Sequence, residues 1–377
     1  MPAEIEERVG GRDVSRSAPS SFLGIQALRG IAALMVVAFH ATQTWSQHVS
    51  GGTSPWMQGE LGVDIFFVIS GLVMAVSTIG REHKSHPAAS FIKRRLIRLV
   101  PLYWIVTLLV LAKLTFVRGH QQFANSQQLV DTPWQYILAS LTFFPYRNSL
   151  GFVQPILSVG WTLSFEMFFY LLFALALALR VRVASMLAPI MILLAVAGHW
   201  RTADWPAFTT LASPSLLEFL AGLLLGQAIL SGVRIPRVAA ALLCGTGILL
   251  LLWFPTLSHF MPEFTARAIP AALLVSGVTW IEPWTGASIP RWSLLIGDSS
   301  YSIYLVHLVV FSFLVKLFTK MHLLIAGLVR WRDEALVVAM CLCFAIIIGG
   351  LLYSLVERPL TRFLRKRVAR EPRPVVE

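Results

Sequence analysis

The sequence contains little of what a soluble or a disulfide-bonded protein needs. Only 13% of its 377 residues are charged, whereas 56% are hydrophobic and the mean hydropathy is +0.71. Soluble domains carry about 25% charged residues, so this composition excludes a soluble enzyme. The three cysteines, Cys244, Cys341 and Cys343, all lie in apolar segments. Because Cys341 and Cys343 would point to different faces of a helix, we expect neither a disulfide framework nor a metal site.

The excess of positive charge does not indicate a nucleic-acid partner. The net charge is +12 and the isoelectric point is near 10.2. However, the sequence lacks a basic, aromatic-interleaved soluble module that could carry such binding. We interpret the charge as a sign of membrane topology and expect no nucleic acid among the partners.

Ten apolar segments are long enough to cross roughly 30 Å of hydrocarbon. They are residues 22–44, 61–79, 98–117, 158–179, 184–199, 215–230, 238–255, 266–281, 300–318 and 334–355. The sequence therefore predicts an all-α, polytopic membrane protein with about ten transmembrane helices. A shorter apolar stretch, 134–144, is predicted to be re-entrant or interfacial.

The distribution of lysine and arginine predicts the orientation. With ten spans and a cytoplasmic N-terminus, 22 of the 31 lysines and arginines lie on the cytoplasmic side. An eleventh span would move the basic C-terminal segment outside and reverse this bias. We therefore expect both termini in the cytoplasm, a disordered tail at 1–21, a ten-helix membrane domain at 22–357 and a basic tail at 358–377.

Ionisable side chains cluster in the first two spans, where each costs at least roughly 2.5 to 3.5 kcal/mol to insert. Arg29 lies near the cytoplasmic face, and His40 follows about 16 Å further along the helix. Asp64, about one turn into the second span, is placed to face His40. A carboxylate bonded to one ring nitrogen leaves the other free to accept a proton. The alternatives are an interhelical hydrogen bond for His40 and a favourable helix-start position for Asp64.

Basic residues also precede the third span, at Lys93, Arg94, Arg95 and Arg98. Arg95 and Arg98 share one helical face. Paired guanidinium groups suit a phosphate or pyrophosphate held on the cytoplasmic side. The alternative is an ordinary cytoplasmic anchor with an aromatic belt.

The fourth span contains the carboxylate that is most costly to insert. Glu166 lies roughly 12 Å below the outer end of this span, with Trp161 and Ser164 within two turns. A side chain at this depth is a candidate for a functional site.

Polar residues recur in the last two spans. Tyr301, Tyr304 and His307 form a stripe at i, i+3 and i+6, for which the alternative is a tyrosine belt with a packed histidine. Glu357 ends the last span beside the basic tail, where a helix-end salt bridge is the alternative to a site role.

As a set, six motifs resemble the acyltransferase 3 family. They are Arg29-x10-His40, GVDIFFVISG, Arg95-x-x-Arg98, WTLSFEMFFY, SYSIYLVH and Glu357-Arg358-Pro359. The resemblance implies a multi-pass O-acyltransferase of the bacterial inner membrane. It also implies that His40 is catalytic, that Arg95 and Arg98 are linked to acyl-CoA use, and that Arg29 and Glu357 are recurrent polar positions.

The resemblance and the depth order together predict a mechanism. The three arginines would hold acyl-CoA, most simply acetyl-CoA, as a donor substrate, with no permanently bound cofactor. A hydroxyl of a glycan or lipid-linked saccharide would approach from the outer side, among membrane lipids. Neutral His40 would be the general base, with Asp64 or Glu166 as its orienting partner. The alternative role for His40 is that of a covalently acylated intermediate. The alternative from another class is a proton-coupled secondary transporter, which no inverted repeat supports.

Overall fold

A computed structural model of the chain describes residues 22–46, 56–79, 87–117, 134–149, 151–202, 204–320 and 332–370. Within these ranges the chain forms helices and connections without a β-strand, which confirms the all-α prediction. The predicted disorder of 1–21 lies outside the described residues.

The α-helices are α1 (Leu23–Trp45), α2 (Leu61–Thr78), α3 (Pro87–Val117), α5 (Trp134–Leu141), α6 (Trp161–Ala178), α7 (Val183–Ala197), α8 (Leu216–Leu230), α9 (Arg237–Leu252), α10 (Phe254–Phe260), α11 (Glu263–Thr285), α12 (Arg291–Lys320), α13 (Arg332–Leu352) and α14 (Arg358–Arg370). Short 3-10 turns are η2 (Met57–Glu60), η3 (Ser158–Gly160), η4 (Gly198–Trp200), η5 (Ala207–Leu211) and η6 (Gly286–Ser288), and η7 (Tyr353–Glu357) is a π-helical turn.

Each of the ten predicted apolar segments falls mainly on one helix, although 238–255 crosses the bend between α9 and α10. Eight described helices are long and apolar enough to cross a membrane, and α9 with α10, bent by 80°, makes a ninth. The tenth, α8, has only 15 residues and spans about 22 Å. The eight residues of α5 span about 12 Å, which is too short to cross, as predicted for this stretch.

Three helix boundaries differ most from the prediction. Helix α3 begins at Pro87 rather than at 98, and α12 begins at Arg291 rather than at 300. Hydropathy marks only the apolar part of a helix, whereas polar residues continue the backbone hydrogen bonding beyond it. In addition, η7 and α14 extend α13 into the predicted basic tail.

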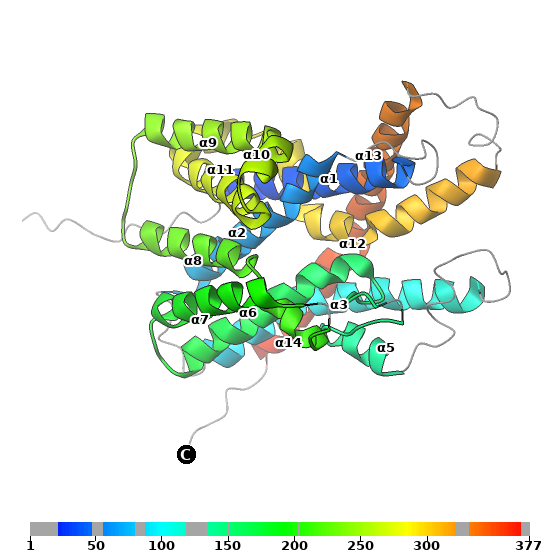
Figure 1. The fold of residues 1–377 in the computed structure, drawn as a ribbon, viewed down its shortest axis with the longest axis horizontal. Helices are drawn as coiled ribbons and strands as arrows, with labels where there is room; N and C mark the ends of the chain where they lie inside the picture. The colour runs from blue at the N-terminus through cyan, green and yellow to red at the C-terminus, as the bar shows by residue number, and fades with distance from the viewer. Residues whose placement is uncertain are drawn as a thin grey trace, which may run out of the picture.

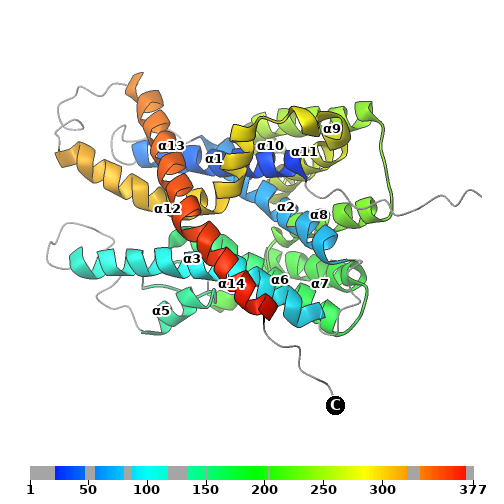
Figure 2. The same cartoon turned by 180° about the vertical axis from the view of Figure 1, so that it is seen from behind.

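The helices form two layers (Figures 1 and 2). One layer contains α1, α9, α11 and α12, and the other contains α3, α6, α7 and α8. Helix α2 runs between them and contacts α1, α8 and α11. The continuous run of α13, η7 and α14 crosses obliquely from the first layer to the second, where α14 contacts α3 (Figure 2).

Glycines allow α2 to approach its neighbours at backbone distance. A Cβ atom on Gly71 would lie 2.1 Å from the carbonyl oxygen of Phe219, and one on Gly222 would lie 1.9 Å from that of Val68. A Cβ atom on Gly62 would lie 2.3 Å from a backbone oxygen of α1. Gly62 and Gly71 on α2 and Gly222 on α8 therefore permit close helix packing. This packing fixes α2, which contributes side chains to both cavities described below.

Candidate functional site

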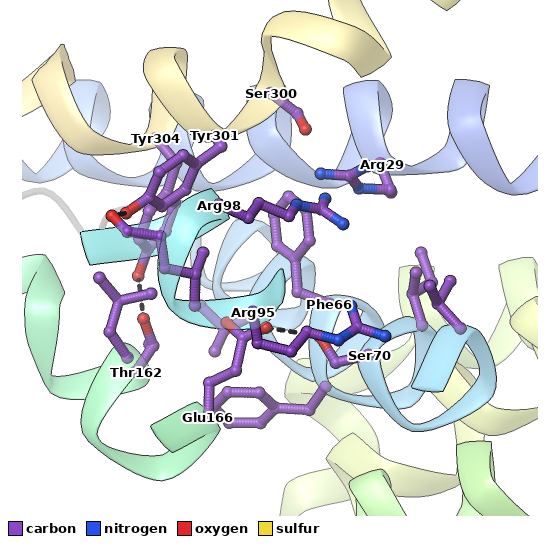
Figure 3. Close-up of a pocket in the computed structure, with 16 residues that line it drawn as sticks. Arg29, Phe66, Ser70, Arg95, Arg98, Thr162, Glu166, Ser300, Tyr301 and Tyr304 are labelled. Atoms are coloured by element: carbon purple, nitrogen blue, oxygen red, sulfur yellow. Dashed lines mark hydrogen bonds between the residues drawn. The ribbon is translucent and has the colours of Figure 1, made fainter. Parts of the chain in front are cut away.

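Polar side chains from five helices converge on a cavity of about 90 Å³, which we call the arginine pocket (Figure 3). It lies among α1, α2, α3, α6 and α12. Its polar and charged lining consists of Arg29, Ser70, Arg95, Arg98, Thr162, Glu166, Ser300, Tyr301 and Tyr304. The structure thus brings together the three arginines that the sequence places at the cytoplasmic side.

Aromatic rings hold one of these arginines in place. The guanidinium carbon of Arg95 lies 5.6 Å from the ring centroids of both Phe91 and Tyr170. Its Nη2 donates a hydrogen bond to Ser77 Oγ at 3.0 Å. Cation–π contacts on two rings restrict the guanidinium without neutralising its charge. Arg95 is therefore a preorganised cation rather than a mobile anchor.

The other two arginines approach each other from different helices. In Figure 3, Arg98 on α3 points toward Arg29 on α1. The Arg29 side chain also donates a hydrogen bond to Gln26 Oε1 at 3.3 Å. Two like charges that share a cavity favour an anion between them, because an anion relieves their repulsion.

Glu166 belongs to this pocket. Its carboxylate accepts a hydrogen bond from the hydroxyl of Tyr170. It accepts a second one from Ser70 Oγ at 3.3 Å (Figure 3). The prediction that Glu166 orients His40 is wrong, because these contacts hold its carboxylate beside the arginines. Among the described residues it supplies the pocket's negative charge.

Two further hydrogen bonds tie α12 to the helices beside the pocket. Tyr301 donates to the carbonyl oxygen of Leu99 at 2.7 Å. Ser302 donates to Glu357 at 2.5 Å, so the predicted site residue Glu357 binds a hydroxyl across the bundle. Glu357 lies on the π-helical turn η7, and such turns often occur at functional sites.

A second cavity, of about 720 Å³, lies toward the other ends of the helices, and we call it the histidine cavity. His40 is near the end of α1, whereas Arg29 is near its beginning. The polar and charged lining of this cavity consists of His40, Glu60, Asp64, Trp161, His199, Ser213, Ser215, Glu218, Glu263, Arg267 and Tyr304.

The ring of His40 is held by an amide and a second imidazole. Its Nδ1 lies 3.2 Å from Gln43 Oε1, and the ring stacks on that of His307 with 5.2 Å between centroids. A side-chain amide oxygen only accepts hydrogen bonds, so Nδ1 carries the hydrogen. Nε2 of His40 is then the nitrogen that accepts a proton.

Asp64 has a different partner from the one predicted. Its Oδ1 accepts a hydrogen bond from Nε of Arg267 at 3.2 Å, and Arg267 also binds Glu60 at 2.8 Å and Glu263 at 3.2 Å. The prediction that Asp64 orients His40 is therefore wrong. An opposite charge within salt-bridge distance attracts a buried carboxylate more strongly than a neutral imidazole does.

Tyr301 and Tyr304 are buried and so do not form an interfacial belt, whereas His307 is packed in the interior, as that alternative predicted. Nδ1 of His307 donates to the carbonyl oxygen of Tyr304 at 2.7 Å. Its Nε2 has no hydrogen-bond partner among the described residues. The hydroxyl of Tyr304 lies 3.0 Å from Thr162 Oγ1 (Figure 3). It also lies 3.2 Å from the carbonyl oxygen of Val159.

Four charged residues of the histidine cavity were missed at the sequence level, namely Glu60, Glu218, Glu263 and Arg267. Glu218, on α8, is 2% exposed, and Arg267 lies near the start of α11. The insertion cost that singled out Glu166 applies equally to Glu218 in LLEFLAG, so the signal was present. Arg267 is one of the lysines and arginines that the ten-span topology leaves on the outer side, so it was not considered as a site residue. Its partners also gave no signal, because Asp64 is distant in sequence and Glu60 and Glu263 lie outside the predicted spans.

The two cavities adjoin each other. Val63, Phe67 and Tyr304 line both of them. Trp161 lines the histidine cavity and contacts Phe67 edge to face, with 6.4 Å between ring centroids. Ser164 instead lines a separate pocket of about 190 Å³ with Trp161, so the predicted site residues fall into three neighbouring spaces.

Comparisons with known proteins show the family of the chain. The acyltransferase domain of the acyltransferase 3 family matches residues 22–355. The chain is 35% identical over 340 residues to the exopolysaccharide production protein ExoZ of Rhizobium meliloti, with 87% of this chain and 96% of that protein covered. It is 27% identical to the acyltransferase MdmB of Streptomyces mycarofaciens, with 94% and 95% covered.

A more distant relative is the peptidoglycan O-acetyltransferase OatA of Listeria monocytogenes, which is 26% identical over 75% of this chain and 48% of that protein. No solved structure matches the chain. The family match spans nearly all of the described helices, and both cavities lie within it. The chain therefore belongs to the acyltransferase 3 family and is a membrane O-acyltransferase.

Proposed function

We propose that the protein transfers an acyl group, most simply acetyl, from acyl-CoA to a hydroxyl of an exported or cell-surface glycan in the bacterial inner membrane. The observation that carries this proposal is the pair of adjoining cavities, one lined by three arginines and the other by His40. Relatives named for exopolysaccharide production and peptidoglycan O-acetylation support a glycan acceptor.

The arginine pocket suits the donor. Acyl-CoA carries several phosphate charges, and guanidinium groups bind phosphate through paired hydrogen bonds. At about 90 Å³ the pocket is too small for the nucleotide. The phosphates would lie at the mouth of the pocket, which we place on the cytoplasmic side, and the narrow acyl-pantetheine arm would pass toward Val63, Phe67 and Tyr304.

The histidine cavity suits the acceptor and the chemistry. Nε2 of His40 takes the hydroxyl proton while the hydroxyl oxygen attacks the carbonyl carbon of the thioester. The carbon–sulfur bond then breaks, and the proton passes from His40 to the departing thiolate. Free CoA leaves with its thiol restored, the acceptor keeps the new ester, and His40 is neutral again.

An assay with the reconstituted protein distinguishes the proposed acyl transfer from the alternative of a secondary transporter. Purified protein in lipid nanodiscs receives radiolabelled acetyl-CoA and a delipidated exopolysaccharide fraction. We expect the label to appear on the polysaccharide as an alkali-labile ester, with one free thiol formed per acetyl group. A transporter consumes no thioester, so the absence of thiol release and ester formation would overturn the proposal.

A further inference from the structure

A third cavity, of about 190 Å³, lies beside the histidine cavity and takes no part in the proposed acyl transfer. We call it the aromatic pocket, because its lining includes the aromatic side chains of Phe144, Tyr146, Trp161 and Phe165. Trp161 also lines the histidine cavity, so the two spaces share a wall. An extended molecule bound beside His40 can therefore reach the aromatic pocket.

Hydrogen bonds between two connections hold the walls of this pocket in place. One connection runs between α5 and η3, and the other between η4 and η5. Arg147 joins them, because it donates hydrogen bonds to the carbonyl oxygens of Gly151 at 3.0 Å and Trp205 at 2.9 Å. The amide nitrogen of Ile156 donates to Ser140 Oγ at 3.0 Å. The pocket is thus largely ordered before a ligand binds, which lowers the entropic cost of binding.

The pocket contains polar groups without a partner in the protein. Ser164, on α6, is 8% exposed and lines the pocket. Its Oγ is accessible to a water-sized molecule and makes no hydrogen bond with the described residues. The side chains of Tyr146 and Gln154, which also line the pocket, make none with them either. A ligand with hydrogen-bonding groups would therefore be stabilised here.

This lining suits a neutral sugar ring better than an anion or an acyl chain. The described lining contains no charged side chain, so it does not attract a phosphate or a carboxylate. An acyl chain would leave the hydroxyl and amide groups without partners, which costs free energy. A sugar ring places C–H groups against aromatic faces and directs its hydroxyls toward polar side chains.

We propose that the aromatic pocket is a subsite for one neutral sugar ring of the acceptor, with Phe144 and Trp161 as stacking side chains and Ser164 and Gln154 as hydrogen-bonding ones. This inference rests on the proposed function for the identity of the acceptor. At about 190 Å³ the pocket suits one ring, whereas the histidine cavity of about 720 Å³ receives the ring that is acylated. The site therefore favours an oligosaccharide over a monosaccharide.

Binding measurements test this subsite without acyl-CoA. The protein in nanodiscs is titrated with tritiated cellotetraose, chitotetraose and β-1,4-galactotetraose, and with the monosaccharide of each. We expect at least one tetrasaccharide to bind at least about tenfold more tightly than its monosaccharide. Phe144→Ala should weaken binding of that tetrasaccharide roughly two- to tenfold, the range for one aromatic contact, and leave binding of the monosaccharide unchanged.

Phe152→Ala is the matched control for this variant. Phe144 is 57% exposed and Phe152 is 59% exposed on the same connection, but only Phe144 lines the pocket. Phe152→Ala should therefore change neither affinity. Ser164→Ala removes only a hydroxyl oxygen, so it keeps the test decisive if Phe144→Ala disturbs the connection. We expect it to weaken tetrasaccharide binding about fivefold, as for one hydrogen bond.

A photo-crosslinking phenylalanine analogue at position 144 identifies the occupant. Crosslinks to the tetrasaccharide would support the subsite. Crosslinks to nanodisc lipid alone would show that a lipid fills the pocket and would overturn the proposal.

The remaining outcomes separate the subsite from the proposed function. Binding of no tetrasaccharide, or parental affinity in both Phe144→Ala and Ser164→Ala, would overturn the subsite. Tetrasaccharide binding that depends on these two side chains, without acyl transfer from acyl-CoA to any saccharide, would support the subsite and contradict the proposed function.

Discussion

His40 on α1 and His307 on α12 stack their imidazole rings with 5.2 Å between centroids and 30° between planes. Gln43 and the carbonyl oxygen of Tyr304 each take an Nδ1 hydrogen. Both rings therefore keep Nε2 as the accepting nitrogen. The Gln43 amide thus orders the His40 ring through Nδ1 and leaves Nε2 as the basic nitrogen. The orienting partner of this histidine is an amide rather than a carboxylate.

Removing the side-chain amide of Gln43 should reduce turnover. We expect Gln43→Leu to lower kcat roughly 5- to 150-fold, because one lost hydrogen bond to the half-buried His40 ring costs about 1 to 3 kcal/mol. The apparent KM for acyl-CoA should stay within twofold. Gln43→Glu keeps an oxygen acceptor and should retain more activity than Gln43→Leu. Steady-state kinetics of purified variants measure this, and a parental kcat for Gln43→Leu would contradict the orienting role.

Replacing an arginine of the arginine pocket should weaken the binding of acyl-CoA. We expect Arg95→Ala and Arg98→Ala each to raise the apparent KM for acyl-CoA more than tenfold, since a charge-assisted hydrogen bond contributes about 1.5 to 3 kcal/mol. Lysine at either position should restore only part of the affinity, because it lacks the planar guanidinium.

Arg94→Ala is the matched control for these variants. Arg94 is exposed and outside the lining of the arginine pocket, so its loss should leave the KM nearly unchanged. Donor affinity that stays parental in both Arg95→Ala and Arg98→Ala, at normal membrane abundance, would refute the assignment.

Much of the fold and part of the site could be predicted from the sequence because membrane insertion imposes a large local cost on charge. That cost located Arg29, His40 and Glu166, and all three line the described cavities. The pairing of these groups could not be predicted. Asp64 and Arg267 are 203 residues apart, and only tertiary packing brings them together.

The sequence also could not predict which face of each helix points into the bundle. In a membrane both lipid and protein interior are apolar, so the hydrophobic pattern does not show which face points inward. Glu166 therefore appeared to belong with His40, although its side chain binds Ser70 and lines the arginine pocket. Likewise, hydropathy alone placed the start of α3 after Arg95, although the helix begins at Pro87.

Close packing of α2 on α8 gives a prediction about stability. We expect Gly222→Ala to lower the melting temperature in detergent, because its Cβ would lie 1.9 Å from the carbonyl oxygen of Val68. Overpacking of this kind costs about 1 to 3 kcal/mol. Gly245→Ala, where the added Cβ meets no atom within 4 Å, should be neutral or slightly stabilising. Equal melting temperatures for the two variants would contradict the packing argument.

The charge distribution predicts which side of the membrane each segment faces. A cysteine replacing Ser126 or Gly52 should react with an impermeant maleimide added outside intact cells, whereas one replacing Arg365 should react only after permeabilisation. The native cysteines are first replaced by alanine. Protection of position 126 together with outside labelling of position 365 would show that the orientation is reversed.

The most direct test of the account is acyl transfer by His40→Gln compared with His40→Ala. Loss of a general base costs about 100- to 10,000-fold in rate, and a glutamine amide cannot accept the hydroxyl proton. We therefore predict that both variants insert normally, bind acyl-CoA with parental affinity and transfer acyl groups at least 100-fold more slowly than the parent. Transfer by His40→Gln at close to the parental rate would contradict the catalytic assignment, because it would show that the histidine acts only as a hydrogen-bonding side chain.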